Sequence, residues 1–169
     1  MPELNLTDIM NENSFEIKKA SEFSINEINK FKKILINKGE VIESTFDKLI
    51  QKDPILLFYP NTNNLKVIGA LKIPLKGYKS DVFKNSKSPL KPNDFSYELG
   101  WIVVLEREKG IGNKITKLLS EFKTKIYSTV RKENEVMIHI LTKIGFEKTG
   151  VSYNSKRGDY KINLYTLNK

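Results

Sequence analysis

Hydrophobic and polar positions follow two periods along this chain, and the two periods predict a mixture of strands and helices. Near the start, alternating apolar residues predict a strand over 14–20. A stripe with helical spacing follows Ser24, which forms a capping box with Glu27, and predicts a helix that ends near Gly39. A shorter helix is expected over 44–51.

The middle of the chain reads as a hairpin followed by a polar segment. Apolar runs over 55–59 and 65–75 flank a turn rich in Asn and predict two antiparallel strands. The segment 76–94 is rich in Lys, Ser and Pro and shows no clear period. A loop of this length is either a mobile linker or a functional lid or binding loop, and the sequence leaves both open.

The second half alternates strands and helices. The run 99–105 predicts a strand, and a loop with two glycines then leads into an amphipathic helix that ends near Lys125. The apolar stripe of that helix consists of Ile115, Leu118, Leu119 and Phe122. A strand over 126–130 follows, then a helix with Asn134 as its N-cap and Gly145 as its stop. The runs 146–153 and 160–167 predict a closing hairpin.

Composition limits the kinds of function to consider. The chain has 169 residues, enough for one domain with a real core. It has no cysteine and one histidine, which argues against disulfides, a Cys nucleophile and a His-rich or thiolate metal site. The residues 1–13 lack an apolar signal-like run, and no stretch is apolar enough to cross a membrane, so a cytoplasmic protein is expected.

The net charge of +9 suggests an anionic partner such as nucleic acid, a ribosomal surface or a phosphorylated cofactor. The lysines are, however, spread along the whole chain without an aromatic and basic cluster. An AT-rich genome explains that composition more simply, and nucleic acid ranks last among the expected partners.

The most informative stretch is the loop between the strand over 99–105 and the helix that follows. Glycines before a helix let an anion approach the backbone N–H groups at the positive end of the helix dipole. The dinucleotide fingerprint is excluded because Ile115 stands where its third glycine is needed, and the P-loop because Asn113 follows Gly112. The remaining pattern is Arg-x-x-Gly-x-Gly, from Arg107 to Gly112.

This pattern resembles the acetyl-CoA pyrophosphate loop of the GNAT superfamily of N-acyltransferases. Downstream, 134–146 is similar to the second signature of that family, an Asn-started helix that ends in Gly-Phe. The resemblance covers 14–169 and implies a single α/β (α+β) domain after an N-terminal extension over 1–13. Its expected architecture is a mixed, mostly antiparallel seven-stranded sheet with helices on both faces.

The resemblance also implies a set of residues for acetyl-CoA. The pantetheine arm would pair with the main chain of Ile102, Val103 and Val104, and the pyrophosphate would bind the loop Arg107, Glu108, Lys109, Gly110, Ile111, Gly112 and Asn113. Glu108 departs from the common family pattern, so its side chain must point away from phosphate. Asn134 would approach the cofactor besides capping its helix, and Lys143 would reach the nucleotide phosphates. The alternatives are a cap alone and a solvated lysine.

Acetyl transfer needs a base for the attacking amine and, in many members, an acid for the leaving thiolate. Glu98 is the candidate base, since family bases often come from this part of the strand; an ordinary ion-paired carboxylate is the alternative. Leu141 stands where the family often has a tyrosine acid. Tyr153, our first candidate, Tyr160 or Tyr127 would replace it, or the thiolate leaves without a dedicated acid.

Three functions remain open from the sequence. The first is an acetyl-CoA-dependent N-acetyltransferase that acts on an amine-bearing small molecule, peptide or protein by direct attack. The second is a non-catalytic acyl-CoA-binding regulatory domain, and the third is a nucleic-acid or ribosome-associated module. Dimers are common in the family, so a homodimer is compatible with the first. Charge balance mildly disfavours strongly cationic acceptors such as polyamines.

Overall fold

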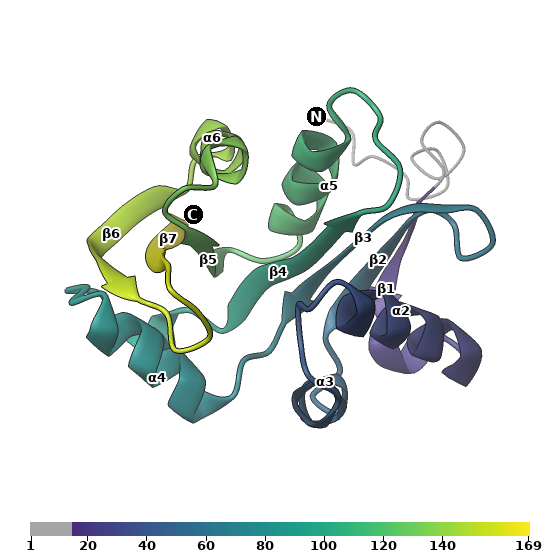
Figure 1. Cartoon of the computed structure of the whole chain (residues 1–169), viewed down its shortest axis with the longest axis horizontal. Coiled ribbons are helices and arrows are strands. Elements are labelled where there is room, and N and C mark those ends of the chain that lie inside the picture. Colours follow the sequence, from purple (N-terminus) through teal and green to yellow (C-terminus); the bar gives the residue numbers. More distant parts are fainter. Residues whose placement is uncertain (1–14) are drawn as a thin grey trace. The chain divides into compact units, whose positions relative to one another are not determined.

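The computed structural model describes residues 15–169, and the expected extension over 1–13 lies outside them. Seven strands run through the described chain (Figure 1). They are β1 (Glu16–Lys19), β2 (Ile55–Pro60), β3 (Leu65–Lys72), β4 (Tyr97–Val104), β5 (Lys125–Arg131), β6 (Glu147–Asn154) and β7 (Lys161–Asn168).

Five α-helices and two short 3₁₀ turns connect the strands within the described residues. The helices are α2 (Ile25–Asn37), α3 (Glu43–Ile50), α4 (Lys76–Asn85), α5 (Ile111–Ser120) and α6 (Glu135–Ile144), and the turns are η1 (Ala20–Glu22) and η2 (Pro92–Asp94). Ser24 and Glu27 form the expected capping box at the start of α2. Gly145 ends α6 in the left-handed conformation, with φ of 117°.

Hydrogen bonds join the strands in the order β1-β2-β3-β4-β5-β7-β6. The pairs β1·β2, β5·β7 and β6·β7 are antiparallel, and β4·β5 is parallel. The predicted mixed and mostly antiparallel seven-stranded sheet is therefore confirmed. The parallel pairing of β4 with β5 covers Tyr97↔Ile126 and Glu98↔Tyr127 in the described structure.

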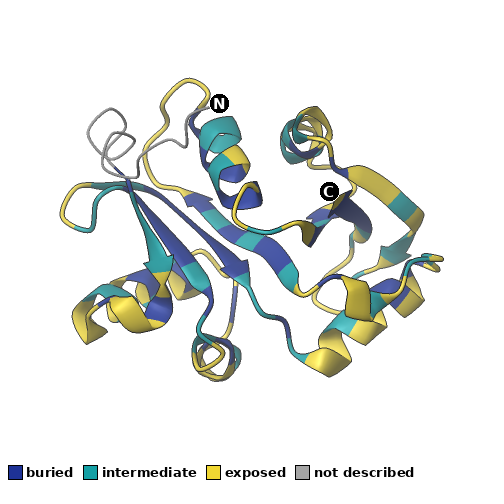
Figure 2. Cartoon of the chain, turned by 180° about the vertical axis from the view of Figure 1, so that it is seen from behind, coloured by how far each residue is buried: buried dark blue, intermediate teal, exposed yellow. Residues whose placement is uncertain are grey.

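The described chain forms two compact units, one with residues up to Ala70 and Trp101–Ile111, the other with Leu71–Gly100 and Gly112–Lys169. In the first unit, an aromatic cluster joins α2, α3, β2 and β4. Its rings belong to Phe23, Phe31, Phe46, Phe58 and Trp101, with neighbouring centroids 4.9 to 6.4 Å apart. Figure 2 shows the buried strands β2 and β3 of this unit and the exposed outer faces of α2 and α3.

The core of the second unit contains a cluster that ties α4 to the strands. Val82, Phe83, Phe95, Tyr127 and Leu164 form it, and each is at most 4% exposed. Apolar burial of this size contributes roughly 1.5–3 kcal/mol per large side chain. The cluster explains why α4 is ordered even though its own sequence has little helical pattern.

Helix α4 corrects one expectation: the segment 76–94 was predicted as a loop, yet its first half is helical. Its apolar residues are only Tyr78, Val82 and Phe83, too few to form a stripe that marks the helix in the sequence. The predicted end of the next helix near Lys125 is also wrong. Helix α5 ends at Ser120, and Phe122 is 40% exposed instead of continuing the apolar stripe.

Among the described residues, no helix is long and apolar enough to cross a membrane. The described residues also contain no group of three or more His, Asp or Glu side chains that could hold a metal ion.

Candidate active site

The glycine loop begins at the end of β4 and is attached to β3. The amides of Leu105 and Glu106 both donate to the carbonyl oxygen of Lys66, at 2.7 and 3.2 Å. Gly110 has a φ of +75°, a backbone conformation that residues other than glycine rarely adopt. The loop therefore turns sharply just before α5, at a position where the sequence supplies glycine.

Glu108 is directed toward β3. Its carboxylate lies 3.7 Å from the ammonium of Lys66, and both side chains are partly exposed. The resemblance requires this acidic side chain to point away from a bound phosphate, and the ion pair gives it another partner. Arg107 and Lys109 on either side are exposed. The loop thus offers the two cations Arg107 and Lys109, while the carboxylate of Glu108 is paired with Lys66.

At the first turn of α5, Gly112 faces helix α6. A Cβ on Gly112 would lie 3.5 Å from Cδ1 of Ile140, which is an ordinary contact. An alanine would therefore fit at this position, and the φ of Gly112 is not in the left-handed region. The first backbone N–H groups of α5 have no partners within the helix, as at any helix start, and can bind an anion.

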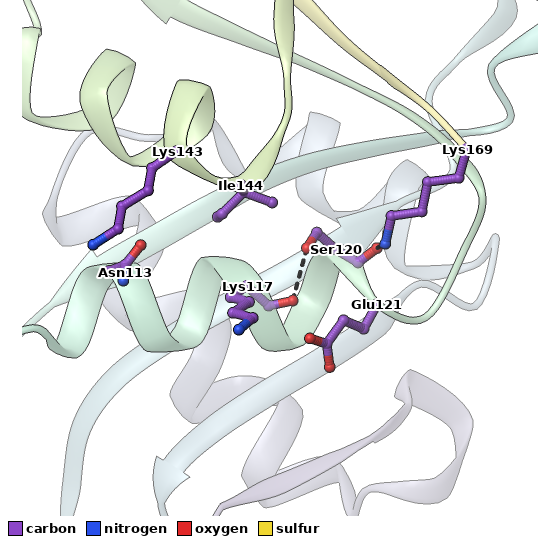
Figure 3. A pocket seen from close by; sticks show the side chains of 7 residues that line it. All are labelled: Asn113, Lys117, Ser120, Glu121, Lys143, Ile144 and Lys169. Carbon is purple, nitrogen blue, oxygen red and sulfur yellow. Dashed lines mark hydrogen bonds between the residues drawn. The ribbon is translucent and has the colours of Figure 1, made fainter. Parts of the chain in front are cut away.

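A pocket of about 320 Å³ lies along α5 and the end of α6 (Figure 3). Its lining residues are Asn113, Lys117, Ser120, Glu121, Lys143, Ile144 and Lys169. Three of these are lysines and one is a glutamate, so the pocket favours an anionic group. Ser120 and Lys169 shape its far end, since Lys169 Nζ donates to the Ser120 carbonyl at 3.4 Å.

Asn134 caps α6 as predicted. Its side-chain oxygen accepts a hydrogen bond from the amide of Met137 at 3.1 Å. The residue is exposed, which leaves the rest of the amide accessible.

Glu98 on β4 is buried beside a lysine. The residue is 3% exposed, and its Oε1 lies 2.6 Å from Nζ of Lys72 at the end of β3. The other oxygen, Oε2, accepts a hydrogen bond from the hydroxyl of Tyr78 on α4, at 3.1 Å. Burial deprives a carboxylate of its solvation, which costs several kcal/mol, and partners such as Lys72 and Tyr78 compensate for this loss.

Three tyrosines surround this carboxylate, and all three are held in their protonated form. The negative charge of Glu98 and burial raise the pKa of Tyr78. Burial first and Glu98 second raise the pKa of Tyr127, and the same two causes raise the pKa of Tyr153 to about 12. The cluster of Glu98, Lys72, Tyr78, Tyr127 and Tyr153 therefore contains a proton acceptor next to groups that keep their protons.

Tyr127 differs from the other two tyrosines. It is fully buried, and its hydroxyl has no hydrogen-bond partner among the described residues. Tyr78 is 45% exposed, although its hydroxyl reaches Glu98. Tyr153, on β6, is half-buried.

The residue after Gly100 has an unusual backbone. Trp101 has a φ of +53°, which is rare for a bulky residue and marks an irregularity in β4. Its ring packs 5.3 Å from Phe46 and 6.0 Å from Phe31, which holds it in this conformation. The residues 102–104, the predicted contacts of the pantetheine arm, directly follow this irregularity.

The structure thus brings together Glu98 and Tyr153, the two predicted catalytic residues. It places Tyr160 elsewhere, because the guanidinium of Arg131 lies 3.9 Å from the centre of its ring. Lys72 and Tyr78 were missed from the sequence. The only signal for Lys72 was a lysine at the end of a strand that is apolar apart from Lys66, and Tyr78 lay in the segment expected to be a loop.

No protein-family model matches the chain, and no curated protein matches its sequence. Solved structures do match its fold. An N-acetyltransferase from Staphylococcus aureus Mu50 has a TM-score of 0.62 at 12% identity, over 91% of this chain and 97% of the other. An acyl-CoA N-acyltransferase from Pseudomonas aeruginosa has a TM-score of 0.61 at 12% identity, over 92% of this chain and 99% of the other.

Arabidopsis thaliana NAA60, solved in complex with acetyl-CoA, has a TM-score of 0.57 at 13% identity, over 90% of this chain and 97% of its own. Another similar structure is described as a GNAT-family acetyltransferase from Bacillus cereus, with a TM-score of 0.57 at 16% identity, over 92% of this chain and 97% of the other. The fold predicted from the glycine loop and the second signature is therefore confirmed: the chain has the fold of the GNAT acetyltransferases.

Proposed function

We propose that this protein is an acetyl-CoA-dependent N-acetyltransferase that transfers an acetyl group to a primary amine in a ternary complex. The observation that carries the proposal is the buried Glu98 on β4, surrounded by protonated tyrosines in a chain with the GNAT fold. Such a carboxylate can accept the proton that the amine loses, directly or through water.

The residues at the loop and the pocket fit the cofactor. The α5 amides at Gly112 and Asn113, with Arg107 and Lys109, would hold the pyrophosphate, and Lys143 in the lysine-lined pocket would meet the nucleotide phosphates. Main-chain groups of residues 102–104 would pair with the pantetheine arm. Acetyl-CoA supplies the activated acetyl group as a thioester.

Two residues of the chain each carry out one of the two proton transfers. Glu98 takes the proton from the amine nitrogen, while Tyr153 keeps its proton at neutral pH and can donate it to the leaving sulfur. Tyr78 orients the carboxylate through its hydrogen bond to Oε2.

Calorimetric titration of acetyl-CoA tests the cofactor site, with CoA and adenosine diphosphate titrated alongside. We expect micromolar binding that Gly112→Asp weakens at least about tenfold, because the new carboxylate faces a diphosphate. Gly112→Ala is the matched control: its Cβ makes only an ordinary 3.5 Å contact with Ile140, so it should fold as the wild type does and lose clearly less affinity than Gly112→Asp, since it adds no charge. Absence of binding in the folded protein would refute the proposal.

Turnover is tested by thiol release with a panel of amines. We expect Glu98→Gln to lower kcat/KM by about 10² to 10⁴, the usual contribution of a general base, with little change in acetyl-CoA affinity. A wild-type level of activity in this variant would show that Glu98 is not the base.

A non-catalytic acyl-CoA-binding domain is the second candidate. One observation favours it: Leu141, where the family often has its tyrosine acid, is fully buried. Binding of acetyl-CoA without turnover on any amine would establish this alternative. The cytoplasmic location and the homodimer expected from the sequence stay predictions.

A further inference from the structure

The ion pair between Glu98 and Lys72 fixes the charge of the site. Nζ of Lys72 lies 2.6 Å from Oε1 of Glu98, and the side chains are 15% and 4% exposed. At this distance and burial, the pair contributes no net charge. The candidate base is therefore already neutralised by a cation from the protein itself.

The backbone makes room for this lysine. A Cβ at Gly100 would lie 3.1 Å from Cε and 3.2 Å from Nζ of Lys72, closer than most Cβ contacts. Glu98 and Gly100 are two residues apart in one strand and therefore share a face of β4. The long side chain of Lys72 thus passes over Gly100 to reach the carboxylate of Glu98. The missing side chain at Gly100 leaves the space that Lys72 occupies.

Among residues 15–169, the titratable groups that face Glu98 from other elements are one cation and three phenols. Lys72 comes from β3, Tyr78 from α4, Tyr127 from β5 and Tyr153 from β6. None of them adds a second negative charge at neutral pH, because a phenol with the ordinary pKa of about 10 is already protonated there and the pKa values of these three are raised further.

Helix α4, which carries Tyr78, also brings further positive charge to this part of the molecule. Lys76 and Lys79 lie in the same turn as Tyr78, and Lys79 donates to the carbonyl oxygen of Phe95 at 3.1 Å. Burial and the charge of Lys76 lower the pKa of Lys79. The one carboxylate on α4, Asp81, already has Lys156 as a partner at 3.8 Å. An ammonium that approaches Glu98 would thus meet cations and no unpaired carboxylate of α4.

We infer that the acceptor is an amine of the α-amino type, which is more weakly basic than a lysine side chain and is partly neutral at pH 7, because Lys72 already occupies the cation position beside Glu98. The inference rests on the proposed function and names the substrate class of that same site. Lysine side chains and polyamines arrive as strong cations, and the site disfavours them because Glu98 is already paired with Lys72 and offers no unpaired carboxylate to a second ammonium.

The reaction in this site starts from the neutral amine. The nitrogen lone pair forms a bond to the acetyl carbon while the bond from that carbon to sulfur breaks and sulfur takes the electron pair. One amine proton passes to Glu98, and the sulfur receives a proton from Tyr153 or from water, so the products are the amide and CoA thiol. Lys72 favours a reaction that begins with the neutral amine, since its charge disfavours the binding of an ammonium beside Glu98.

The two amine classes differ strongly in how much neutral form they contain. An α-amino group has a pKa of about 7.7–8.0 and a lysine side chain about 10.4, so at pH 7 the neutral fraction differs by roughly 230- to 420-fold. Greater nucleophilicity of the more basic amine offsets part of this difference. We therefore expect a preference for the α-amine of at least about tenfold in kcat/KM at pH 7.

The first test uses the wild-type protein with two peptides of one sequence, one with a free N-terminus and a blocked lysine, the other with the reverse. CoA release and mass spectrometry of the product give kcat/KM for each at pH 7 and pH 9. The expected result is the tenfold or greater preference at pH 7, narrowing at pH 9 as the lysine deprotonates. Equal or better use of the lysine peptide at pH 7 would overturn the inference and leave the proposed function intact. No CoA release with any amine would instead refute the proposed function.

The second test changes the charge of Lys72. Lys72→Met removes the cation at similar length, and we expect the preference for the α-amine to fall at least about fivefold, with the lysine peptide gaining in kcat/KM relative to the other. Lys72→Arg keeps the charge and should keep the preference even where the rate falls. An unchanged preference in a folded Lys72→Met protein would overturn the role of Lys72. Should that variant not fold, Lys72→Gln removes the same charge with a polar side chain and carries the same expectation, while the wild-type comparison decides the substrate class.

Discussion

The backbone of Gly150 on β6 approaches Ser86 so closely that a Cβ on Gly150 would lie 2.0 Å from the Ser86 carbonyl oxygen. The same oxygen accepts a hydrogen bond from the amide of Val151 at 2.7 Å. Ser86 directly follows the last residue of α4, and Gly150 lies within a register shift between β6 and β7. The irregular part of β6 thus holds the end of the helix that brings Tyr78 to Glu98.

Gly150→Ala should therefore destabilise the protein strongly. The φ of Gly150 is +69°, which costs an alanine about 1–2 kcal/mol, and the clash with Ser86 must be relieved by moving α4 or β6. We expect a total loss of more than about 3 kcal/mol in the free energy of unfolding, measured by urea denaturation.

Gly39→Ala is the matched control for this change. Gly39 has the same φ of +69°, but nothing lies within 4 Å of its Cβ position. It should lose only the conformational part, about 1–2 kcal/mol. Equal losses in the two variants would show that α4 and β6 do not press on each other at Gly150.

Asn134 is expected to have two roles that substitutions can separate. Asn134→Ala removes the side-chain acceptor for the Met137 amide and should cost about 1 kcal/mol of stability, whereas Asn134→Ser keeps a capping oxygen and most of the stability. If the amide also binds the cofactor, both variants lose roughly three- to tenfold in acetyl-CoA affinity, the value of one hydrogen bond. An unchanged affinity for acetyl-CoA by calorimetry would show that Asn134 serves only as the N-cap of α6.

Tyr127→Phe tests the hydroxyl that lacks a hydrogen-bond partner among the described residues. A buried polar group without a partner lowers stability, so its removal at constant ring volume should leave the free energy of unfolding unchanged or raise it by up to about 1 kcal/mol. Thermal and urea unfolding measure this. A clear loss of stability would mean that the hydroxyl interacts with Glu98, whose charge helps to raise the pKa of Tyr127, or with a bound water.

Local patterns in the sequence predicted most of the elements but only part of the site. The capping box at Ser24, the N-cap at Asn134 and the stop at Gly145 are signals within one or two turns, and the structure confirms all three. Helix α4 was missed because Val82 and Phe83 make it a helix through burial against other elements, which no local period records. In α5, Phe122 extended the apolar stripe although the helix ends at Ser120.

The candidate site shows the same division. Glu98 was singled out from its own strand, but its partners Lys72 and Tyr78 come from a different strand and a different helix. Which side chains meet across a sheet depends on strand order and register, and these become visible only in the folded chain. Tyr153 was preferred to Tyr160 from the sequence alone, and the fold adds that Arg131 lies over the ring of Tyr160.

The tyrosines around Glu98 predict how stability depends on alkaline pH. The pKa of Tyr153 in the folded protein is raised to about 12, above the ordinary value of about 10 that it has when unfolded. Between these values the unfolded chain loses the phenolic proton and the folded protein keeps it, so rising pH favours unfolding. The stability contributed by this group is complete below about pH 10 and is lost as the pH rises to about 12.

Urea unfolding of the wild type and of Tyr153→Phe, from pH 8 to pH 11.5, measures this contribution. The variant lacks the titrating phenol, so its stability should fall less steeply above about pH 10, while lysine titration affects both proteins alike. Below pH 9 the two curves should run parallel. Curves that stay parallel to pH 11.5 would show that neither burial nor Glu98 raises the pKa of Tyr153. Tyr153 would then not lie close enough to Glu98 to act with it in catalysis.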